Sequence, residues 1–297
     1  MNAMRNFLKI LLIIYTFYYP WGLLFISLDL LPPQIAWFGS LFLIMLGTII
    51  GAWLVVNYGR YGIVASLLIL VLSWLLEHIG VVTGFPFGIY HYTDVLIPRV
   101  GGSVPLAMAF AWLLVVATSI GVTERLLQEP PEGQPLPSPP TQPAVRPTRV
   151  AKPLKIAIAA SFVTLLDIVL EPAVTRVTGY WRWEEEIYTH TFYGVPLSNF
   201  IAWWVAAAFF VWLLLSLQER AVRARNAAFP TQPFERMMPW LPTLLYLLLL
   251  GQFFVINLTH GNLIAALIGG IVLAYIIFEW VRPHLFRAYS REEGETR

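Results

Sequence analysis

Stretches of about 20 mostly apolar residues recur along the whole chain, and they limit what it can fold into. A helix of that length rises about 30 Å, which is enough to cross the hydrocarbon core of a membrane. Charged residues make up only 12% of the 297 residues, whereas soluble domains carry about 25%. We therefore predict an all-α fold, a polytopic transmembrane helical bundle of about eight spans. The expected spans are 7–28, 35–56, 61–83, 103–124, 154–176, 196–217, 240–258 and 262–282.

Basic residues fall on alternate connections between these spans. Lys and Arg occur at the N-terminus, at the Arg60 turn, in the connections at 125–155 and 218–239, and after residue 282. Cytoplasmic loops of membrane proteins are enriched in Lys and Arg. We therefore expect a multi-pass protein of the cell membrane with both termini in the cytoplasm. We interpret the basic connections as topology signals and lipid-headgroup contacts, and not as a nucleic-acid surface.

A proline-rich stretch divides the chain into two sets of four spans. Residues 128–150 contain eight prolines and almost no large apolar side chains, so they cannot pack a core. We expect a four-span N-terminal half at 1–127, a cytoplasmic linker at 128–153 and a four-span C-terminal half at 154–297. The two halves would form one membrane domain.

A sequence pattern before the linker recurs after it. Each copy orders a carboxylate, a glycine, aromatic residues, Val-Pro and a tryptophan. In both copies the proline precedes the tryptophan by seven residues, at Pro105 and Trp112 and at Pro196 and Trp203. Both units enter and leave the membrane on the same side, so an axis along the membrane normal would relate them. We expect spans 3–4 and 5–6 to form an internal parallel repeat that builds one membrane-embedded site.

Three carboxyl groups inside the predicted spans are the candidates for chemistry. Asp167 and Glu171 lie one turn apart in the fifth span, and Glu77 holds the corresponding place in the third. Ionised carboxylates at such depth cost about 2.5–3.5 kcal/mol or more, so they face the bundle interior or a wet cavity. Burial and the like charge nearby favour one neutral carboxyl, which is a proton donor. The alternatives are a hydrogen-bonded pair that joins helices and, for Glu77, an ion pair with Arg99 or Arg176.

Aromatic side chains crowd the two predicted outer connections. At this depth such groups commonly form the interfacial belt, but π faces can also hold a polyene and stabilise a cation. Glycines and prolines interrupt both connections, which favours folded-back segments covered by protein. Six residues are the candidates for substrate binding: Phe87, Tyr90, Trp181, Trp183, Asn199 and Trp203.

The cysteine count, the histidine spacing and the lack of phosphate-binding motifs exclude several kinds of active site. The chain has no cysteine, which excludes disulfides, thiol nucleophiles and Cys-ligated metal centres. Its histidines show no HxxxH or HExxH spacing, and it has neither a glycine-rich phosphate loop nor a DDxxD motif. We therefore expect no metal site and no cofactor.

Taken together, these residues resemble the membrane carotenoid 1,2-hydratase family, which includes bisanhydrobacterioruberin hydratase and γ-carotene 1′,2′-hydratase. The resemblance covers spans 3 to 6. It rests on Glu77 with residues 83–90, on Asp167 with Glu171-Pro172, and on residues 179–183 and 193–203. It implies cofactor-independent hydration of the terminal 1,2 or 1′,2′ double bond of an acyclic carotenoid end, giving a tertiary hydroxyl. A carotenoid such as lycopene or γ-carotene would be the substrate, membrane lipids would surround it, and association with other carotenoid biosynthesis enzymes would fit the same role.

Hydration of such an end needs a proton at C2, a tertiary cation at C1 and a base that activates water there. We expect Asp167 or Glu171 to give the proton, and its partner or Glu77 to orient the water and deprotonate it. Which carboxyl is the acid stays open. Three other functions fit the same residues: a proton-coupled transporter or lipid carrier, another isoprenoid enzyme such as a lycopene cyclase, and a non-catalytic assembly protein.

Overall fold

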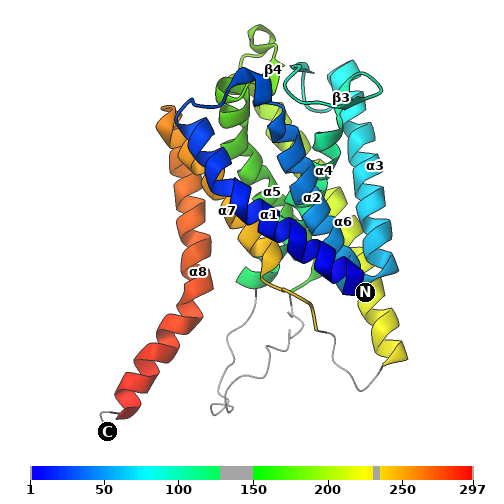
Figure 1. Ribbon diagram of the computed structural model, residues 1–297, viewed down its shortest axis with the longest axis vertical. Coiled ribbons are helices and arrows are strands. Elements are labelled where there is room, and N and C mark those ends of the chain that lie inside the picture. Colours follow the sequence, from blue (N-terminus) through cyan, green and yellow to red (C-terminus); the bar gives the residue numbers. More distant parts are fainter. Residues whose placement is uncertain (1, 128–149, 230–234, 296–297) are drawn as a thin grey trace.

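The described part of the chain forms eight helices that are long and apolar enough to cross a membrane (Figure 1). The computed structural model describes residues 2–127, 150–229 and 235–295. The helices are α1 (Asn2–Ser27), α2 (Phe38–Tyr58), α3 (Arg60–Thr83), α4 (Leu106–Leu126), α5 (Lys152–Pro172), α6 (Leu197–Ala228), α7 (Leu241–Thr259) and α8 (Leu263–Glu295). The prediction of an all-α bundle with eight spans is confirmed, and the chain is a multi-pass membrane protein.

Several helices extend beyond the predicted spans. The helix α6 continues past residue 217 to Ala228, and α8 continues past residue 282 to Glu295. The predicted ends followed the loss of apolar residues, but Gln, Glu, Arg and Ala are good helix formers and carry the helix into water. Of the predicted linker at 128–153, residues 128–149 lie outside the described part of the chain. Its last two residues, Lys152 and Pro153, form the first turn of α5, where proline is tolerated.

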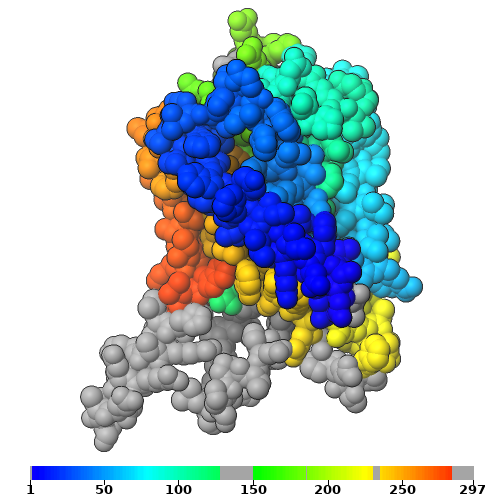
Figure 2. Space-filling view, viewed as in Figure 1, coloured from blue at the N-terminus to red at the C-terminus, as the bar shows by residue number. Residues whose placement is uncertain are grey.

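The helix α4 is the one around which the others pack. It contacts α2, α3, α5, α6, α7 and α8, and 14 of its 21 residues are buried. Many of these are Ala, Val, Ser or Thr, and small residues let helices approach closely. By contrast, α1 lies obliquely across the outside of the bundle (Figures 1 and 2), where it buries only Leu8 and Tyr15. Its exposed apolar side chains suit contact with lipid.

Short strands gather at one end of the bundle (Figure 1). Strand β1 (Tyr90–Tyr92) pairs antiparallel with β4 (Trp181–Trp183), so that Tyr90 lies opposite Trp183. The pairs β2 (Arg99–Val100) with β3 (Val104–Pro105), and β5 (Thr191–Phe192) with β6 (Val195–Pro196), lead into α4 and α6. The β1–β4 pair therefore joins the α3–α4 connection to the α5–α6 connection.

The contacts between the two copies of the sequence pattern agree with a parallel repeat. Helix α3 contacts α4 and α6, and in the same way α5 contacts α6 and α4. Corresponding elements meet each other: β1 pairs with β4, and Trp112 stacks on Trp203 with ring centroids 4.3 Å apart and planes 20° apart. A two-fold axis along the helices would generate this arrangement, and the repeat stays a prediction.

Gly47 allows α2 to approach α4 closely. A Cβ at this position would lie 2.6 Å from Cβ and 2.7 Å from the carbonyl oxygen of Phe110 on α4. We expect Gly47→Ala to lower the free energy of unfolding by about 1–3 kcal/mol, as overpacking does. Gly51→Ala is the matched control one turn along, because its nearest neighbours would lie 3.7 Å away. Chemical unfolding of both variants in detergent checks this; equal stabilities would contradict it.

A contact between His260 and Asp29 ties the α7–α8 turn to the end of α1. Nε2 of His260 lies 3.0 Å from Oδ1 of Asp29. Partial burial lowers the pKa of His260, but the hydrogen bond to Asp29, the hydrogen bond to the carbonyl oxygen of Ile256 and the charge of Asp29 together outweigh it and leave the pKa raised. A raised pKa in the folded state adds stability below the unfolded-state value, and this stability is lost as pH rises through the folded-state value.

We therefore expect His260→Gln to lower the melting temperature at about pH 5.5 and to have a smaller effect at about pH 8.5, since unperturbed histidine titrates near 6.5. Thermal unfolding of the purified protein in detergent at both pH values measures this. His190→Gln is the control, because no described residue pairs with the His190 side chain. An effect that grows with pH would contradict the prediction.

Candidate active site

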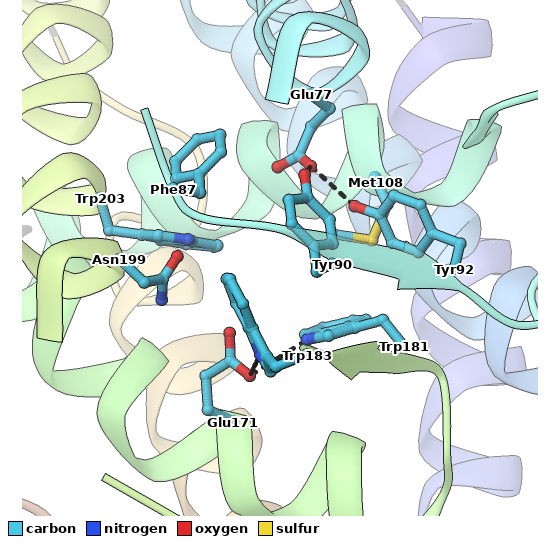
Figure 3. A pocket seen from close by; sticks show the side chains of 10 residues that line it. All are labelled: Glu77, Phe87, Tyr90, Tyr92, Met108, Glu171, Trp181, Trp183, Asn199 and Trp203. Carbon is cyan, nitrogen blue, oxygen red and sulfur yellow. Dashed lines mark hydrogen bonds between the residues drawn. The ribbon is translucent and has the colours of Figure 1, made fainter. Parts of the chain in front are cut away.

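A small, partly open cavity lies where α3, α4, α5 and α6 meet the β1–β4 pair (Figure 3). Its volume is about 20 Å³, and since a water molecule needs roughly 10–15 Å³, it has room for about one. Both copies of the repeat contribute side chains. The lining residues are Glu77, Phe87, Tyr90, Tyr92, Met108, Glu171, Trp181, Trp183, Asn199 and Trp203.

Glu77 accepts hydrogen bonds from three aromatic side chains. Its Oε2 accepts from Oη of Tyr90 at 2.6 Å and of Tyr92 at 2.7 Å, and its Oε1 accepts from Nε1 of Trp112 at 2.8 Å. Residues two apart on a strand face the same way, which lets both tyrosines reach one carboxyl group. Burial, together with the charge of Glu77, raises the pKa of both phenols well above the usual range. Both phenols therefore stay protonated and act as hydrogen-bond donors to Glu77.

The ion pair considered for Glu77 is not formed among the described residues. Arg99 binds Asp94 at 3.0 Å, and the guanidinium of Arg176 lies over the ring of Tyr193, 5.2 Å from its centroid. The carboxyl group of Glu77 is bound by neutral aromatic O–H and N–H donors and not by a cation. Glu77 is 3% exposed, so these three donors replace most of the hydration that the carboxyl group loses.

Glu171 is held in a similar way by the other strand. Its Oε2 accepts from Nε1 of Trp181 at 3.1 Å and of Trp183 at 3.2 Å. The chain reaches these positions through η2 (Ala173–Val177), a π-helical segment that continues α5. Such segments are frequent at functional sites. Figure 3 shows the other carboxyl oxygen, Oε1, pointing toward Asn199 and the cavity.

Asp167 lies one turn from Glu171 and does not line the cavity. Its Oδ2 accepts from Nδ2 of Asn199 at 3.1 Å, whereas its Oδ1 is buried and has no partner among the described residues. Asn199 lies in the first turn of α6, is 1% exposed and lines the cavity. It therefore links Asp167 to the cavity.

The two halves of the site share their framework and differ in chemistry. Strand β1 supplies two tyrosines where β4 supplies two tryptophans. Three residues after the proline of Val-Pro, the first copy has Met108 and the second has Asn199. An indole N–H only donates, whereas a phenol both donates and accepts. Only the second half contains two carboxyl groups.

The structure brings eight of the nine predicted site residues to the cavity: Glu77, Glu171, Phe87, Tyr90, Trp181, Trp183, Asn199 and Trp203. The ninth, Asp167, lies behind Asn199. Their roles in binding and catalysis stay predictions. Tyr92 and Met108 also line the cavity and were not predicted. Tyr92 follows from the two-residue period of β1, and Met108 from its correspondence with Asn199.

Within the described residues, no group of three or more His, Asp or Glu side chains is placed to hold a metal ion. The three carboxyl groups instead bind aromatic N–H and O–H groups and one amide. Such a site can position a water molecule and exchange a proton.

Comparison with known proteins gives one match. The model of a family described as carotenoid biosynthesis protein matches residues 38–276, a range that contains every residue of the site. No curated protein and no solved structure matches the chain.

Removing the Glu77 carboxyl group should destabilise the protein. Glu77→Leu removes the acceptor of two phenols and one indole, and each buried donor left unpaired costs about 1–3 kcal/mol. Glu77→Gln should be milder, because its amide oxygen still accepts from Trp112 and its N–H groups reach the phenol oxygens. Thermal unfolding in detergent compares the two, with the exposed Glu184→Leu as control. Equal stability of the Leu and Gln variants would contradict this hydrogen-bond network.

Proposed function

The chain belongs to the carotenoid biosynthesis protein family, and from this premise we propose that it hydrates the terminal 1,2 or 1′,2′ double bond of an acyclic carotenoid end. The observation that carries the proposal is the small cavity with room for about one water, lined by two carboxyl groups and by aromatic faces. Lycopene or γ-carotene has the required end group. The product would carry a tertiary hydroxyl.

The reaction needs only an acid, a base and water. A carboxyl group gives its proton to C2, the electrons of the C1–C2 double bond form the new C–H bond, and C1 becomes a tertiary cation. The oxygen of water then bonds to C1, and a carboxylate accepts the proton that water releases. Nothing is oxidised or reduced. Asp167 and Glu171 are the candidates for the acid.

Aromatic faces around the cavity support a cationic intermediate. Trp203 stacks on Trp112, and the ring of Trp183 lies 5.0 Å from that of Tyr90. Such faces attract a cation by about 0.5–2 kcal/mol, most strongly where water is excluded. Because the carotenoid end is larger than the cavity, covering side chains must move to admit it. The rest of the polyene would lie among apolar side chains and lipid.

A lycopene cyclase and a transporter would each need a site with other features. A lycopene cyclase also protonates a polyene end, but it has to keep water from the cation, so a water-sized cavity beside the acid favours hydration. A transporter of the kind that breaks its helices at mid-membrane would need interruptions in α3 to α6. Each of these four is continuous over its apolar length, and the π-helical segment lies at the end of α5.

Expression in cells that accumulate lycopene or γ-carotene tests the activity. We expect a carotenoid heavier by one water molecule, measured by liquid chromatography with mass spectrometry. A cyclised product keeps the mass of its substrate, and an assembly protein leaves the pigment unchanged, so either result would contradict hydration.

Carboxyl variants test the mechanism in the same cells. At least one of Asp167→Asn, Glu171→Gln and Glu77→Gln should lower hydrated product by about 10²–10⁴-fold, the usual contribution of a general acid or base. Asp29→Asn is the control, since this carboxyl group lies in the α1–α2 connection and binds His260. Full activity in all three site variants would rule out the acid–base mechanism.

A further inference from the structure

The three carboxyl groups of the site differ in the number of donors that they accept. Glu77 accepts three hydrogen bonds, Glu171 accepts two, and Asp167 accepts one. Each hydrogen bond to a carboxyl oxygen stabilises the charged form and occupies a position at which a proton could bind. This difference separates the roles that the three groups can take.

Neither oxygen of Glu77 is free of a hydrogen-bond donor. Tyr90 and Tyr92 occupy Oε2, and Trp112 occupies Oε1. An indole N–H cannot reverse its hydrogen bond. A carboxylate has about four acceptor sites, so a proton on Glu77 would take the last one, at Oε1, and would weaken the hydrogen bonds from all three buried donors. Glu77 has the contacts of a fixed carboxylate, and it lines the same cavity as Trp183 and Trp203.

Asp167 has no direct access to the cavity. It is 1% exposed, and it does not line the cavity, whereas the Asn199 side chain that donates to it does. A substrate atom in the cavity would meet the amide of Asn199 before it could meet the carboxyl group of Asp167. Asp167 is therefore placed to hold Asn199 and not to touch reacting atoms.

Glu171 presents a free oxygen to the cavity. Both indole donors bind its Oε2, and no donor within the described part of the chain binds its Oε1. Figure 3 shows Oε1 directed between Asn199 and Trp183. Because two donors from one strand fix Oε2, they also fix the direction in which Oε1 points.

We propose that Glu171 is both the catalytic acid and the catalytic base of the hydration, that Asp167 is a positioning residue acting through Asn199, and that Glu77 is a fixed carboxylate that faces the cation. This assignment rests on the hydration proposed above. Neutral Glu171 transfers the proton on Oε1 to C2, which leaves the cation at C1. Water adds its oxygen to C1 and returns one proton to the Glu171 carboxylate, so the carboxyl group ends as it began.

Two conservative variants test the assignment with purified protein in lipid nanodiscs. Glu171→Gln keeps an oxygen for the two indoles but has no proton to transfer, so kcat should fall about 10²–10⁴-fold with KM little changed. Asp167→Asn keeps an oxygen that accepts from Asn199, so kcat should stay within about tenfold of the wild type, less than a general acid contributes. Melting temperatures of both variants show whether each is folded.

If Asp167 positions Asn199, a variant that cannot accept its hydrogen bond should lose activity without losing stability. A purely structural role predicts no such loss. Asp167→Leu removes the partner of Asn199 and should lose the activity that Asp167→Asn keeps, at comparable thermal stability. The pH profile of kcat should keep the wild-type shape in Asp167→Asn and in Glu77→Gln, because neither residue exchanges the proton.

The outcomes separate this assignment from the proposed function. If the wild type hydrates the carotenoid but Asp167→Asn loses as much kcat as Glu171→Gln, or Glu171→Gln keeps wild-type kcat, the assignment is overturned and the hydration stands. A changed pH profile in Asp167→Asn overturns it as well. A wild-type protein that makes no hydrated product overturns the proposed function and the assignment together.

Discussion

Carboxyl groups buried within a membrane-spanning bundle need hydrogen-bond donors, and this requirement organises the site. Water is scarce at this depth, so the donors have to come from the protein. Strands β1 and β4 supply them, because alternate residues on each strand face the same way and two aromatic donors reach one carboxyl group. The pairing of β1 with β4 holds both sets of donors over the ends of α3 and α5. The folded-back connections are thus part of the site and not only links between spans.

The repeated framework explains how one cavity acquires different carboxyl groups. The two copies meet at equivalent positions, through the β1–β4 pair and through the stack of Trp112 on Trp203. A symmetric site would treat both carboxyl groups alike. Here the first copy places three donors on the two oxygens of Glu77, and the second leaves one oxygen of Glu171 facing the cavity and adds Asp167 behind Asn199. In the assignment that we propose, divergence within a shared framework lets one half stabilise charge while the other exchanges a proton.

Much of this architecture follows from the sequence, for identifiable reasons. The membrane requires about 20 apolar residues for each span, so hydropathy predicts the eight helices, but not the ends of α6 and α8, because polar helix formers continue them into water. Burial of a carboxylate is costly enough to identify Glu77, Asp167 and Glu171 as inward-facing. The donor to each oxygen could not be predicted, because it depends on the register between β1 and β4, which lie some 90 residues apart. The place of Asn199 between Asp167 and the cavity depends in the same way on how α5 packs against α6.

The central claim is that a buried carboxyl group protonates the polyene end and that water then captures the cation. Mass spectrometry of the product formed in D₂O tests it most directly. The account predicts one deuterium bound to carbon at C2 next to the new tertiary hydroxyl, which survives back-exchange in ordinary water. A hydroxylated product without carbon-bound deuterium would mean that the hydroxyl arrives by another route, and it would contradict the account.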